Sequence, residues 1–327
     1  QQMGLRFEPI KDWTINIDGN MRTHTNNQHW AVLPVYAYDA NNQPYAISWD
    51  GGASYSPGAS RISESRYTED YFTTNIYTDY QKTINDHFFK VMVGFNAELT
   101  RTDNLYGQGD KIISPEVPTI NQTTSEQKVG GGKAENSVAG FFGRINYNYK
   151  DRYMVELNGR YDGSSRFIGD QRWGFFPSVS AGWNIAREEF FGSLSDIFST
   201  LKVRGSWGML GNQQIGNDYY PYINTYATNA KYPFDNKVSG GAVQTENKIQ
   251  DISWEKTTTW GAAVDMTLFN ELQVTLEYYN RKTTGILMQV NVPNTYGYPG
   301  YWDNVGAMRN QGLEVSLAWH KTLGEVQ

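Results

Sequence analysis

Between Phe141 and Ile185 the sequence contains three consecutive segments in which apolar and polar residues alternate, each for about ten positions. An alternation of period two indicates a β-strand, because successive side chains of a strand point to opposite faces. Strands of this length are about twice the ~5–6 residues usual in globular proteins. At ~3.3 Å per residue and a tilt near 45°, ten residues rise roughly 23–25 Å, close to the apolar band of an outer-membrane barrel.

The two faces of these strands differ in chemistry. One face is apolar, and the three segments contribute to it Phe141, Ile145, Tyr147, Tyr153, Val155, Leu157, Tyr161, Phe175, Val179 and Trp183. The opposite faces of these and the other predicted strands hold the charged residues Lys90, Glu98, Arg144, Arg152, Glu156, Arg160, Lys202, Arg204, Asp265, Glu277 and Glu314. A Lys or Arg on a lipid face near the membrane midplane costs ~2–4 kcal/mol. We therefore expect the uncharged faces to meet lipid and the charged faces to line a lumen.

The same alternation recurs along the chain and predicts about eleven strands. It is clear at residues 13–19, 89–99, 201–207, 260–268, 272–279 and 313–320, weaker at 71–84, and partial near residue 5. Tight turn-forming pairs follow some strands, at Lys11-Asp12, Asn85-Asp86, Lys150-Asp151 and Asn270-Glu271, and a longer link follows at 187–200. Long loops are expected near 22–70, 101–136, 163–173, 211–256 and 283–311.

Short turns on one side and long loops on the other are the pattern of a bacterial outer-membrane barrel. We therefore predict an all-β, transmembrane, antiparallel β-barrel, with residues 1–327 forming one partial barrel domain. Pro177 fits this pattern imperfectly, because proline cannot donate to a strand ladder. We expect it to lie where the pairing of its strand is incomplete.

Composition argues against several functions. A net charge of -6 gives no reason to expect a nucleic-acid partner, and the absence of Cys excludes thiolate sites and disulfides. The four His are scattered, and no GxSxG, HExxH or GxxxxGK[ST] string occurs, so we expect neither an enzyme, nor a cofactor, nor a metal centre. Calcium binding by loop carboxylates such as Asp39, Asp103 or Asp235 stays open, although no D-x-D-x-D-G spacing is present.

The ends of the chain indicate a piece of something longer. It begins QQMGLRF, without a basic region followed by an apolar one, and it ends KTLGEVQ just after a predicted strand. We expect an internal segment of a longer protein.

Specific strings add to the pattern. GFFGRINYNYKDRYMVELNGRYDGSSRF and RWGFFPSVSAGWNIAREEFF resemble the SusC/RagA family of TonB-dependent outer-membrane transporters. So do, in order, LKVRGSWGMLGNQQIGNDYYPY, WEKTTTWGAAVDMTLFN and NVGAMRNQGLEVSL. The resemblance implies a 22-strand barrel around a plug, in Bacteroidetes-type bacteria. It also implies a SusD-like surface lipoprotein as a lid, TonB as the energy source, oligosaccharides or peptides as substrates, and a dimer of SusC–SusD pairs.

The chain departs from a full member of that family, because the N-terminal extension, the TonB box, the plug and the remaining strands are missing from it. About eleven strands cannot close a barrel of that width. Two alternatives stay open beside the importer: a soluble or surface-exposed carbohydrate-binding β-protein, and a passive porin.

Aromatic residues in the long loops are the candidate substrate contacts. They are Tyr219, Tyr220, Tyr298, Tyr301 and Trp302, which lie beside amide and carboxylate side chains suited to hydrogen-bonding sugar hydroxyls. Loop packing, lid contact or anchoring at the rim would explain the same residues. For YDGSSRF we favour a structural role, with a turn opening at Asp162-Gly163 and Arg166 pairing within its own loop. The strings around Trp254 and Asn304 are expected to shape the return of the chain into the barrel wall.

Overall fold

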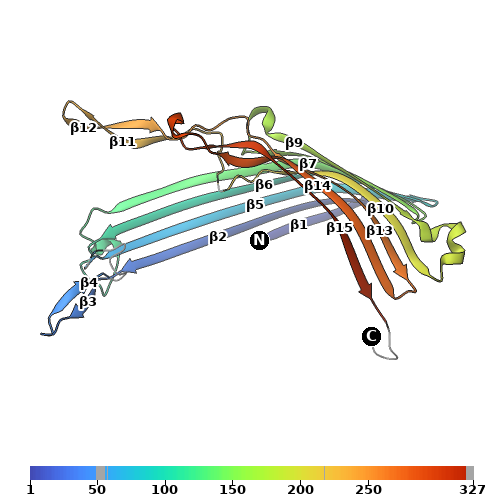
Figure 1. The fold of residues 1–327 in the computed structure, drawn as a ribbon, viewed down its shortest axis with the longest axis horizontal. Helices are drawn as coiled ribbons and strands as arrows, with labels where there is room; N and C mark the ends of the chain where they lie inside the picture. Colours follow the sequence, from blue (N-terminus) through green and yellow to red (C-terminus); the bar gives the residue numbers. More distant parts are fainter. Residues whose placement is uncertain (49–55, 57, 217, 322–327) are drawn as a thin grey trace. The chain divides into compact units, whose positions relative to one another are not determined.

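A computed structural model describes residues 1–48, 56, 58–216 and 218–321. Among them, eleven strands form one sheet in the order β1-β2-β5-β6-β7-β8-β9-β10-β13-β14-β15 (Figure 1). The strands are β1 (Gln2–Ile10), β2 (Trp13–Val32), β5 (Arg61–Ile84), β6 (His87–Asp110), β7 (Lys128–Tyr149), β8 (Tyr153–Ser164), β9 (Trp173–Asn184), β10 (Phe198–Asn212), β13 (Glu255–Leu268), β14 (Leu272–Val290) and β15 (Tyr301–Trp319). The predicted all-β antiparallel class is confirmed, and the sheet is open, since no pairing among the described residues joins β1 to β15.

The connections carry little other secondary structure. Two hold hairpins, β3 (Val35–Tyr38) with β4 (Pro44–Ile47) and β11 (Tyr226–Phe234) with β12 (Lys237–Gln244). The remainder contain 3-10 helices η1 (Ile120–Gln122), η2 (Gly169–Gln171), η3 (Ile185–Arg187), η4 (Glu189–Leu194) and η5 (Asn294–Tyr296). In the described part of the chain, no helix has the length and apolar character that a membrane span requires.

The tight turns form largely where the sequence placed them. Asp12, Asn85, Lys150 and Asp151 adopt left-handed backbone conformations between consecutive strands, with φ between 52° and 71°. The fourth prediction was wrong by one position. Leu268 pairs directly with Leu272, and the left-handed residues are Phe269 and Asn270, with φ of 54° and 62°. The turn is therefore built on a bulky aromatic residue that rarely adopts this conformation.

Several predicted loops were too long, because the strands continue far into them. The loop expected at 22–70 shrinks to a connection over 33–60, of which residues 49–55 and 57 lie outside the described residues; the loop at 101–136 shrinks to 111–127, and that at 283–311 to 291–300. The loops expected at 163–173 and 211–256 are close to the observed connections at 165–172 and 213–254. In the first two, most of the added strand residues are polar on both faces, so the period-two signal disappears although pairing continues.

The chain divides into two compact units. The first comprises residues 20–72 and 99–135 with Gln1. Its strand segments carry cross-strand ion pairs, including Arg22–Glu69 at 3.2 Å, Arg101–Glu135 at 2.7 Å and Lys133–Asp103 at 3.0 Å. These exposed pairs contribute little energy individually, but charges spread over such strands are incompatible with contact to hydrocarbon.

The second unit, residues 2–19, 73–98 and 136–327, has one face that is apolar and exposed. Phe141, Leu157 and Phe175 are 56%, 45% and 59% exposed. A soluble protein rarely leaves an apolar surface of this extent in water. This face, which we call the apolar face, comprises Phe141, Ile145, Tyr153, Val155, Leu157, Tyr161, Trp173, Phe175, Val179, Trp183, Val203, Trp207, Trp260, Leu276 and Tyr278.

Aromatic rings mark both limits of the apolar face. At one end Tyr153 lies 6.3 Å from Tyr149 and 6.4 Å from Trp183, measured between ring centroids. At the other end Tyr161 stacks on Trp173 at 5.0 Å. Tyr153 and Tyr161 are separated along β8 by about 26 Å of strand at ~3.3 Å per residue, or about 19 Å after a 45° tilt. Aliphatic residues between two aromatic bands are the arrangement of a membrane-spanning strand.

Pro177 lies where its strand has only one neighbour. The register of β9 with β10 begins at Ser178, which pairs with Gly208, whereas β9 pairs with β8 along its whole length from Trp173. The interpretation that Pro177 lies in an incompletely paired stretch is confirmed.

Glycines leave space for aromatic rings on the opposite, polar face. A Cβ added to Gly94 would lie 2.5 Å from the ring of Phe142 and 2.6 Å from the Cβ of Tyr77, which is closer than real Cβ contacts allow. At Gly143, on the neighbouring strand, the nearest atom to an added Cβ is a carbonyl oxygen at 3.6 Å, an ordinary contact.

We expect Gly94→Ala to destabilise the barrel by about 1–3 kcal/mol, because the Phe142 ring cannot stay flat on the wall. Gly143→Ala is the matched control and should cost much less. The comparison is made on the full-length protein in detergent, from the urea midpoint of its heat-modifiable electrophoretic migration. Equal midpoints for the two variants would contradict the close approach of Phe142 to Gly94.

Candidate functional site

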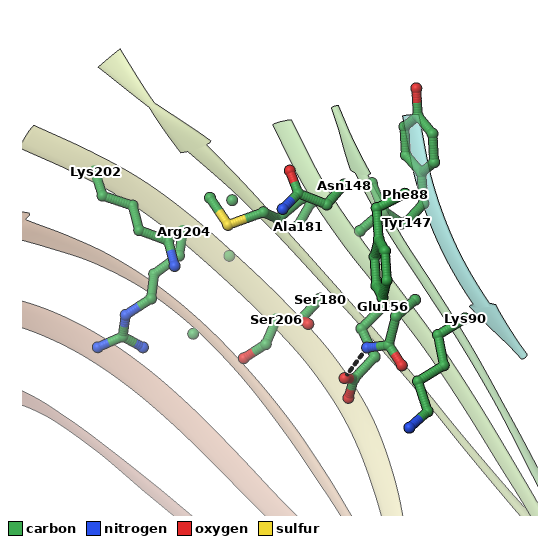
Figure 2. Close-up of a pocket in the computed structure, with 16 residues that line it drawn as sticks. Phe88, Lys90, Tyr147, Asn148, Glu156, Ser180, Ala181, Lys202, Arg204 and Ser206 are labelled. Atoms are coloured by element: carbon green, nitrogen blue, oxygen red, sulfur yellow. Dashed lines mark hydrogen bonds between the residues drawn. The ribbon is translucent and has the colours of Figure 1, made fainter. Parts of the chain in front are cut away.

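The polar face of the second unit contains a groove of about 540 Å³. It is lined from β6, β7, β8, β9, β10 and β13, and its residues include Phe88, Lys90, Asn146, Asn148, Met154, Glu156, Ser180, Ala181, Gly182, Lys202, Arg204, Gly205, Ser206 and Gly261. Figure 2 shows Lys202 and Arg204 at one side and Glu156 and Lys90 at the other. Small residues supply much of the lining between them, so the charged side chains stand at its edges.

Most charges around the groove are already paired. Lys90 Nζ lies 2.9 Å from Asp79, whose other oxygen accepts from the Thr14 hydroxyl at 2.7 Å. Glu156 accepts hydrogen bonds from the amides of Asn146 and Asn158. These groups satisfy one another along the wall, so this part of the groove offers amides and paired charges rather than a field of one sign.

Arg204 reaches across a neighbouring strand to find its partners. Its guanidinium donates to Asp265 at 3.0 Å and to Glu277 at 2.8 Å. The residue opposite Arg204 in the register is Ala263, and Glu277 lies opposite Ala263 in turn. Because Ala263 is small and buried, the arginine passes over it to the second strand. The Arg204 side chain therefore links β10, β13 and β14.

Lys202 differs from these residues. Its hydrocarbon stem lies along the open space at Gly182, where an added Cβ would approach Lys202 Cε to 3.0 Å. Within the described residues, its ammonium group has no ion pair or hydrogen bond, so it is the cation of this groove that is left for a partner.

A second cluster lies where the long connections meet the ends of the strands. Phe167, Phe176, Ile215, Ile252, Trp254 and Leu287 form the buried core, with Met209, Ile249 and Trp302 packed against it. Phe167 and Phe176 both contact the Trp254 ring, at 5.4 and 5.3 Å between centroids. The Trp254 indole also donates to the Arg172 carbonyl at 3.0 Å. The connection over 213–254 is therefore packed against the wall.

Arg166 fixes the same connection from the neighbouring loop. It is only 7% exposed, donates to the Asp218 carbonyl at 2.9 Å and lies over the Tyr219 ring at 5.0 Å. Burial lowers the pKa of the Arg166 guanidinium, an effect opposed by Tyr219 and Asp218. The prediction that Arg166 pairs within its own loop was wrong. Its partners belong to a loop about fifty residues further along the chain, which sequence spacing does not reveal.

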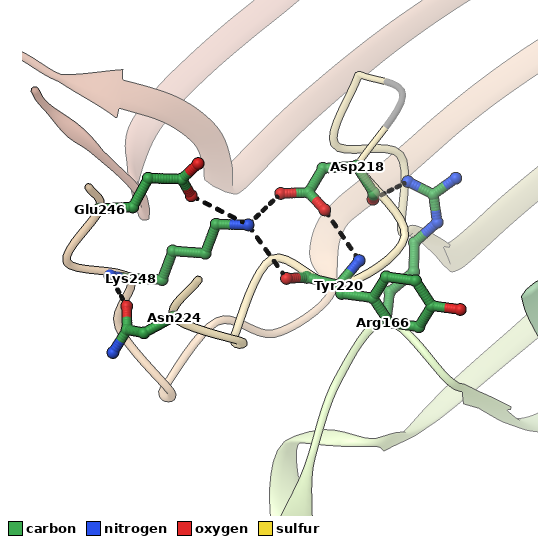
Figure 3. Close-up of polar contacts among 6 residues, drawn as sticks. All are labelled: Arg166, Asp218, Tyr220, Asn224, Glu246 and Lys248. Atoms are coloured by element: carbon green, nitrogen blue, oxygen red, sulfur yellow. Dashed lines mark hydrogen bonds and ion pairs between the residues drawn. The ribbon is translucent and has the colours of Figure 1, made fainter. Parts of the chain in front are cut away.

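Lys248 closes the base of the long connection (Figure 3). Its ammonium group lies 2.8 Å from Asp218, 3.2 Å from Glu246 and 3.2 Å from the Tyr220 carbonyl. Its backbone N–H donates to the Asn224 side chain at 2.6 Å. Burial alone would lower the pKa of Lys248, but the hydrogen bonds and charges of Asp218 and Glu246 raise it overall. The hairpin β11–β12 emerges between these tied segments.

The five predicted contact residues have different neighbours in the structure. Tyr219 lies beneath Arg166, and Trp302 packs against the buried core, so both have structural contacts. The backbone of Tyr220 is held by Asp218 and Lys248. Tyr298 and Tyr301 each approach Tyr296, at 6.0 and 6.5 Å between centroids. Their role in substrate contact stays a prediction.

The family strings have structural roles that differ in part from those expected. Strand β8 continues to Ser164, so the turn predicted at Asp162-Gly163 was placed too early. Asn304 holds three segments together: its side chain exchanges hydrogen bonds with Ser253 and donates to the Gly285 carbonyl at 2.7 Å. Gly285 has a φ of 63°, at a register irregularity between β14 and β15. Asn304 and Trp254 thus act where the chain returns to the wall, as predicted.

The loop carboxylates considered for calcium have other partners or settings. Asp39 accepts from the backbone N–H groups of Asn41 and Gln43, and Asp103 pairs with Lys133. Asp235 sits in the left-handed turn of the hairpin β11–β12. In the described residues, no group of three or more His, Cys, Asp or Glu side chains is arranged to hold a metal ion.

Comparison with known proteins identifies the family to which this strand sheet belongs. The family model for the TonB dependent receptor-like β-barrel matches residues 4–325. The chain belongs to this family. It is similar to the TonB-dependent receptor SusC of Bacteroides thetaiotaomicron, with 33% identity over 292 residues that cover 86% of this chain and 27% of that protein. It is also similar to the TonB-dependent receptor P26 of Formosa agariphila, with 35% identity over 215 residues, covering 64% and 20%.

Solved structures show the same fold. The RagAB peptide importer in its closed-closed state matches with a TM-score of 0.84 at 21% identity, covering 99% of this chain and 34% of that chain. The family model and the relative SusC confirm the SusC/RagA resemblance and the outer-membrane location, and receptors of this family are transporters rather than enzymes. The chain spans about a quarter of the length of the curated relatives it matches. That residues 1–327 form one partial barrel domain stays a prediction.

Replacing Lys248 by Met should loosen the base of the 213–254 connection, because three polar contacts of its ammonium group are lost. We expect faster amide hydrogen exchange at residues 218–224 in the full-length receptor, read by mass spectrometry. Lys237→Met, on the exposed strand β12, is the control and should leave that segment unchanged.

The polar contacts of the Lys248 ammonium group should also persist at alkaline pH. A lysine with a raised pKa stabilises the folded state below its ordinary value of 10.5, and this contribution is lost only as pH rises through the raised value. Unchanged exchange in Lys248→Met would show that the connection is held without this side chain.

Proposed function

We propose that the protein containing this chain is an outer-membrane importer of the SusC/RagA type. It would take up oligosaccharides or peptides, using energy relayed by TonB and a SusD-like surface lipoprotein as a lid. One observation carries the proposal: a strand wall with an uncharged, exposed apolar face and an opposite face lined by amides and paired charges. The relative named SusC at 33% identity supports the transporter class.

The chemistry of the groove favours uncharged or zwitterionic substrates. Asn146, Asn148 and Ser180 offer neutral donors and acceptors, while Lys90 and Arg204 are committed to neighbouring carboxylates. Such a wall suits sugar hydroxyls and peptide amides better than a polyanion. Oligosaccharides and peptides share these groups, so either class fits this surface.

Within the loops, Tyr298 is the best placed of the predicted contact residues. It lies in the connection between β14 and β15, partly exposed, beside the Tyr296 ring. Tyr220 and Tyr301 belong to the same proposal, whereas Tyr219 and Trp302 would act mainly by shaping the loops. Two adjacent tyrosines offer stacking faces together with hydroxyl groups.

The alternatives differ in what they require. A soluble carbohydrate-binding protein would have to cover the apolar face in water, which disfavours it. A passive porin shares the wall but needs no energy source, so it is distinguished by experiment.

In a Bacteroidetes-type host, deletion of tonB should abolish uptake of a fluorescent oligosaccharide or peptide by the full-length protein. Energised transport requires TonB, whereas a porin lets solute diffuse. The measurement is cell-associated fluorescence after washing, for a panel of both substrate classes. Uptake that persists without TonB would favour the porin. Purification of the intact complex in detergent, followed by mass spectrometry of its partners and ligand, tests the SusD-like lid.

Tyr298→Ala should weaken binding of the transported ligand about 2- to 12-fold, since one aromatic contact is worth roughly 0.5–1.5 kcal/mol. Tyr36→Ala, at a tyrosine of the hairpin β3–β4 that is 57% exposed and therefore more open to solvent than Tyr298, is the control. Affinity is measured by calorimetry on the purified complex. Equal affinities for both variants would show that Tyr298 does not contact the ligand.

A further inference from the structure

The link between β9 and β10 differs from the other connections at its end of the sheet. The neighbouring turns at 150–152 and 269–271 are tight, whereas residues 185–197 form the 3-10 helices η3 and η4. Figure 1 shows these helices as the coiled ribbon between β9 and β10. In this family the short turns face the periplasm. A longer structured link there needs an explanation that a simple chain reversal does not supply.

Glu188 ties this link to the apolar face. One carboxylate oxygen accepts hydrogen bonds from the Tyr153 hydroxyl at 2.7 Å and from the Trp183 indole at 2.9 Å. The other oxygen accepts from Arg152 at 3.3 Å. Arg152, which we had expected on the lumen face, therefore acts at the turn. Tyr153 and Trp183 belong to the aromatic band of the apolar face, so the link lies on the lipid side of the wall.

Packing places η4 on the same side. Phe191 is buried and meets the Phe198 ring edge-on, at 6.2 Å between centroids. Phe198 is paired with Leu268, and the sequence pattern assigns Leu268 to the apolar face. Two contacts that do not depend on each other, one polar and one apolar, thus hold the link against the lipid-facing band.

Several apolar side chains of this region remain exposed. Phe190 is 69% exposed, Leu194 44% and Ile197 40%. In the adjacent turn, Phe269 is 64% exposed and its N–H donates to the Ile197 carbonyl at 2.8 Å. Phe269 also holds a left-handed conformation that Asn or Gly would adopt with less strain. In water, an exposed aromatic ring at such a strained turn position has no evident benefit. Insertion of the ring into a membrane interface would explain its exposure.

We propose that residues 185–197, together with Phe269, form an interfacial anchor that inserts Phe190, Leu194 and Phe269 into the periplasmic leaflet of the outer membrane. The surface that this anchor contacts is one of zwitterionic phospholipids. The anchor is continuous with the lipid-facing band through Tyr153 and Trp183. The link carries Arg187 against Glu188, Glu189 and Asp196, a net charge of one minus three, or -2, which disfavours an anionic surface. The proposal does not depend on import.

Spin labels test the insertion directly. This chain has no Cys, so single Cys substitutions at Phe190 and Leu194 of the full-length receptor can be labelled, after any Cys elsewhere is replaced by Ser. In phosphatidylcholine nanodiscs, collision with oxygen is compared with collision with a water-soluble nickel chelate. Both labels should resemble one at Val155 on the apolar face, and differ from labels at Ser206 on the polar face and Lys237 in the hairpin β11–β12.

Labels at 190 and 194 that collide mainly with the nickel chelate would overturn the proposal, as would labels shielded from both reagents, which would indicate a covering protein.

Glu188→Ala should shift the 190 label toward nickel, because the tie to Tyr153 and Trp183 is lost. Glu189→Ala is the control and should cause no shift, because the Glu189 side chain is 90% exposed and reaches Arg152 at 3.6 Å, whereas the ties to Tyr153 and Trp183 belong to Glu188. Phosphatidylglycerol nanodiscs should reduce the oxygen preference. Heat-modifiable migration confirms that each variant is folded.

Discussion

The structure depends on the contact between an uncharged sheet face and lipid. Along β8 and β9 the apolar face holds Val155, Leu157 and Val179 between two aromatic bands, and no part of the chain that the structure describes covers these residues. A soluble sheet would bury such a face against a second layer. Here the ladder satisfies the backbone, as a membrane requires, and lipid takes the place of the missing layer. Between the two aromatic bands, charge is thereby confined to the other face, where it must be paired or hydrated.

This constraint explains how far the sequence predicts the fold. Period two identifies a strand only where the two faces meet different media. It therefore succeeds for β7, β8 and β9 within the apolar band. It fails at the outer parts of β2 and β5, where both faces are polar and the added strand residues were assigned to a loop. There the pairing rests on ladder hydrogen bonds and on ion pairs such as Arg22–Glu69, whose partners are 47 residues apart.

The candidate site was harder to predict than the wall, for a different reason. Part of its groove is lined by Gly182, Gly205 and Gly261, which carry no chemistry that a sequence pattern would reveal. The loop aromatics were recognised by type, but type does not tell packing from binding: Trp302 supports a buried core and Tyr219 a buried arginine. Arg166 was singled out as part of a family string, yet its partner at Asp218 arises only from tertiary contact.

The connections at the two ends of the strands differ in how their apolar side chains are covered. At the loop end, the long connection makes its own core around Trp254, and Arg166 and Lys248 fix it through contacts that span tens of residues. At the turn end there is too little chain to build a core, so apolar side chains such as Phe190 and Phe269 remain exposed. A strand wall must be held at both limits of the membrane if it is to keep its depth. Both ends have protein contacts for this purpose. At the loop end they are those of Arg166 and Lys248, and at the turn end Glu188 holds the link against Tyr153 and Trp183 of the aromatic band.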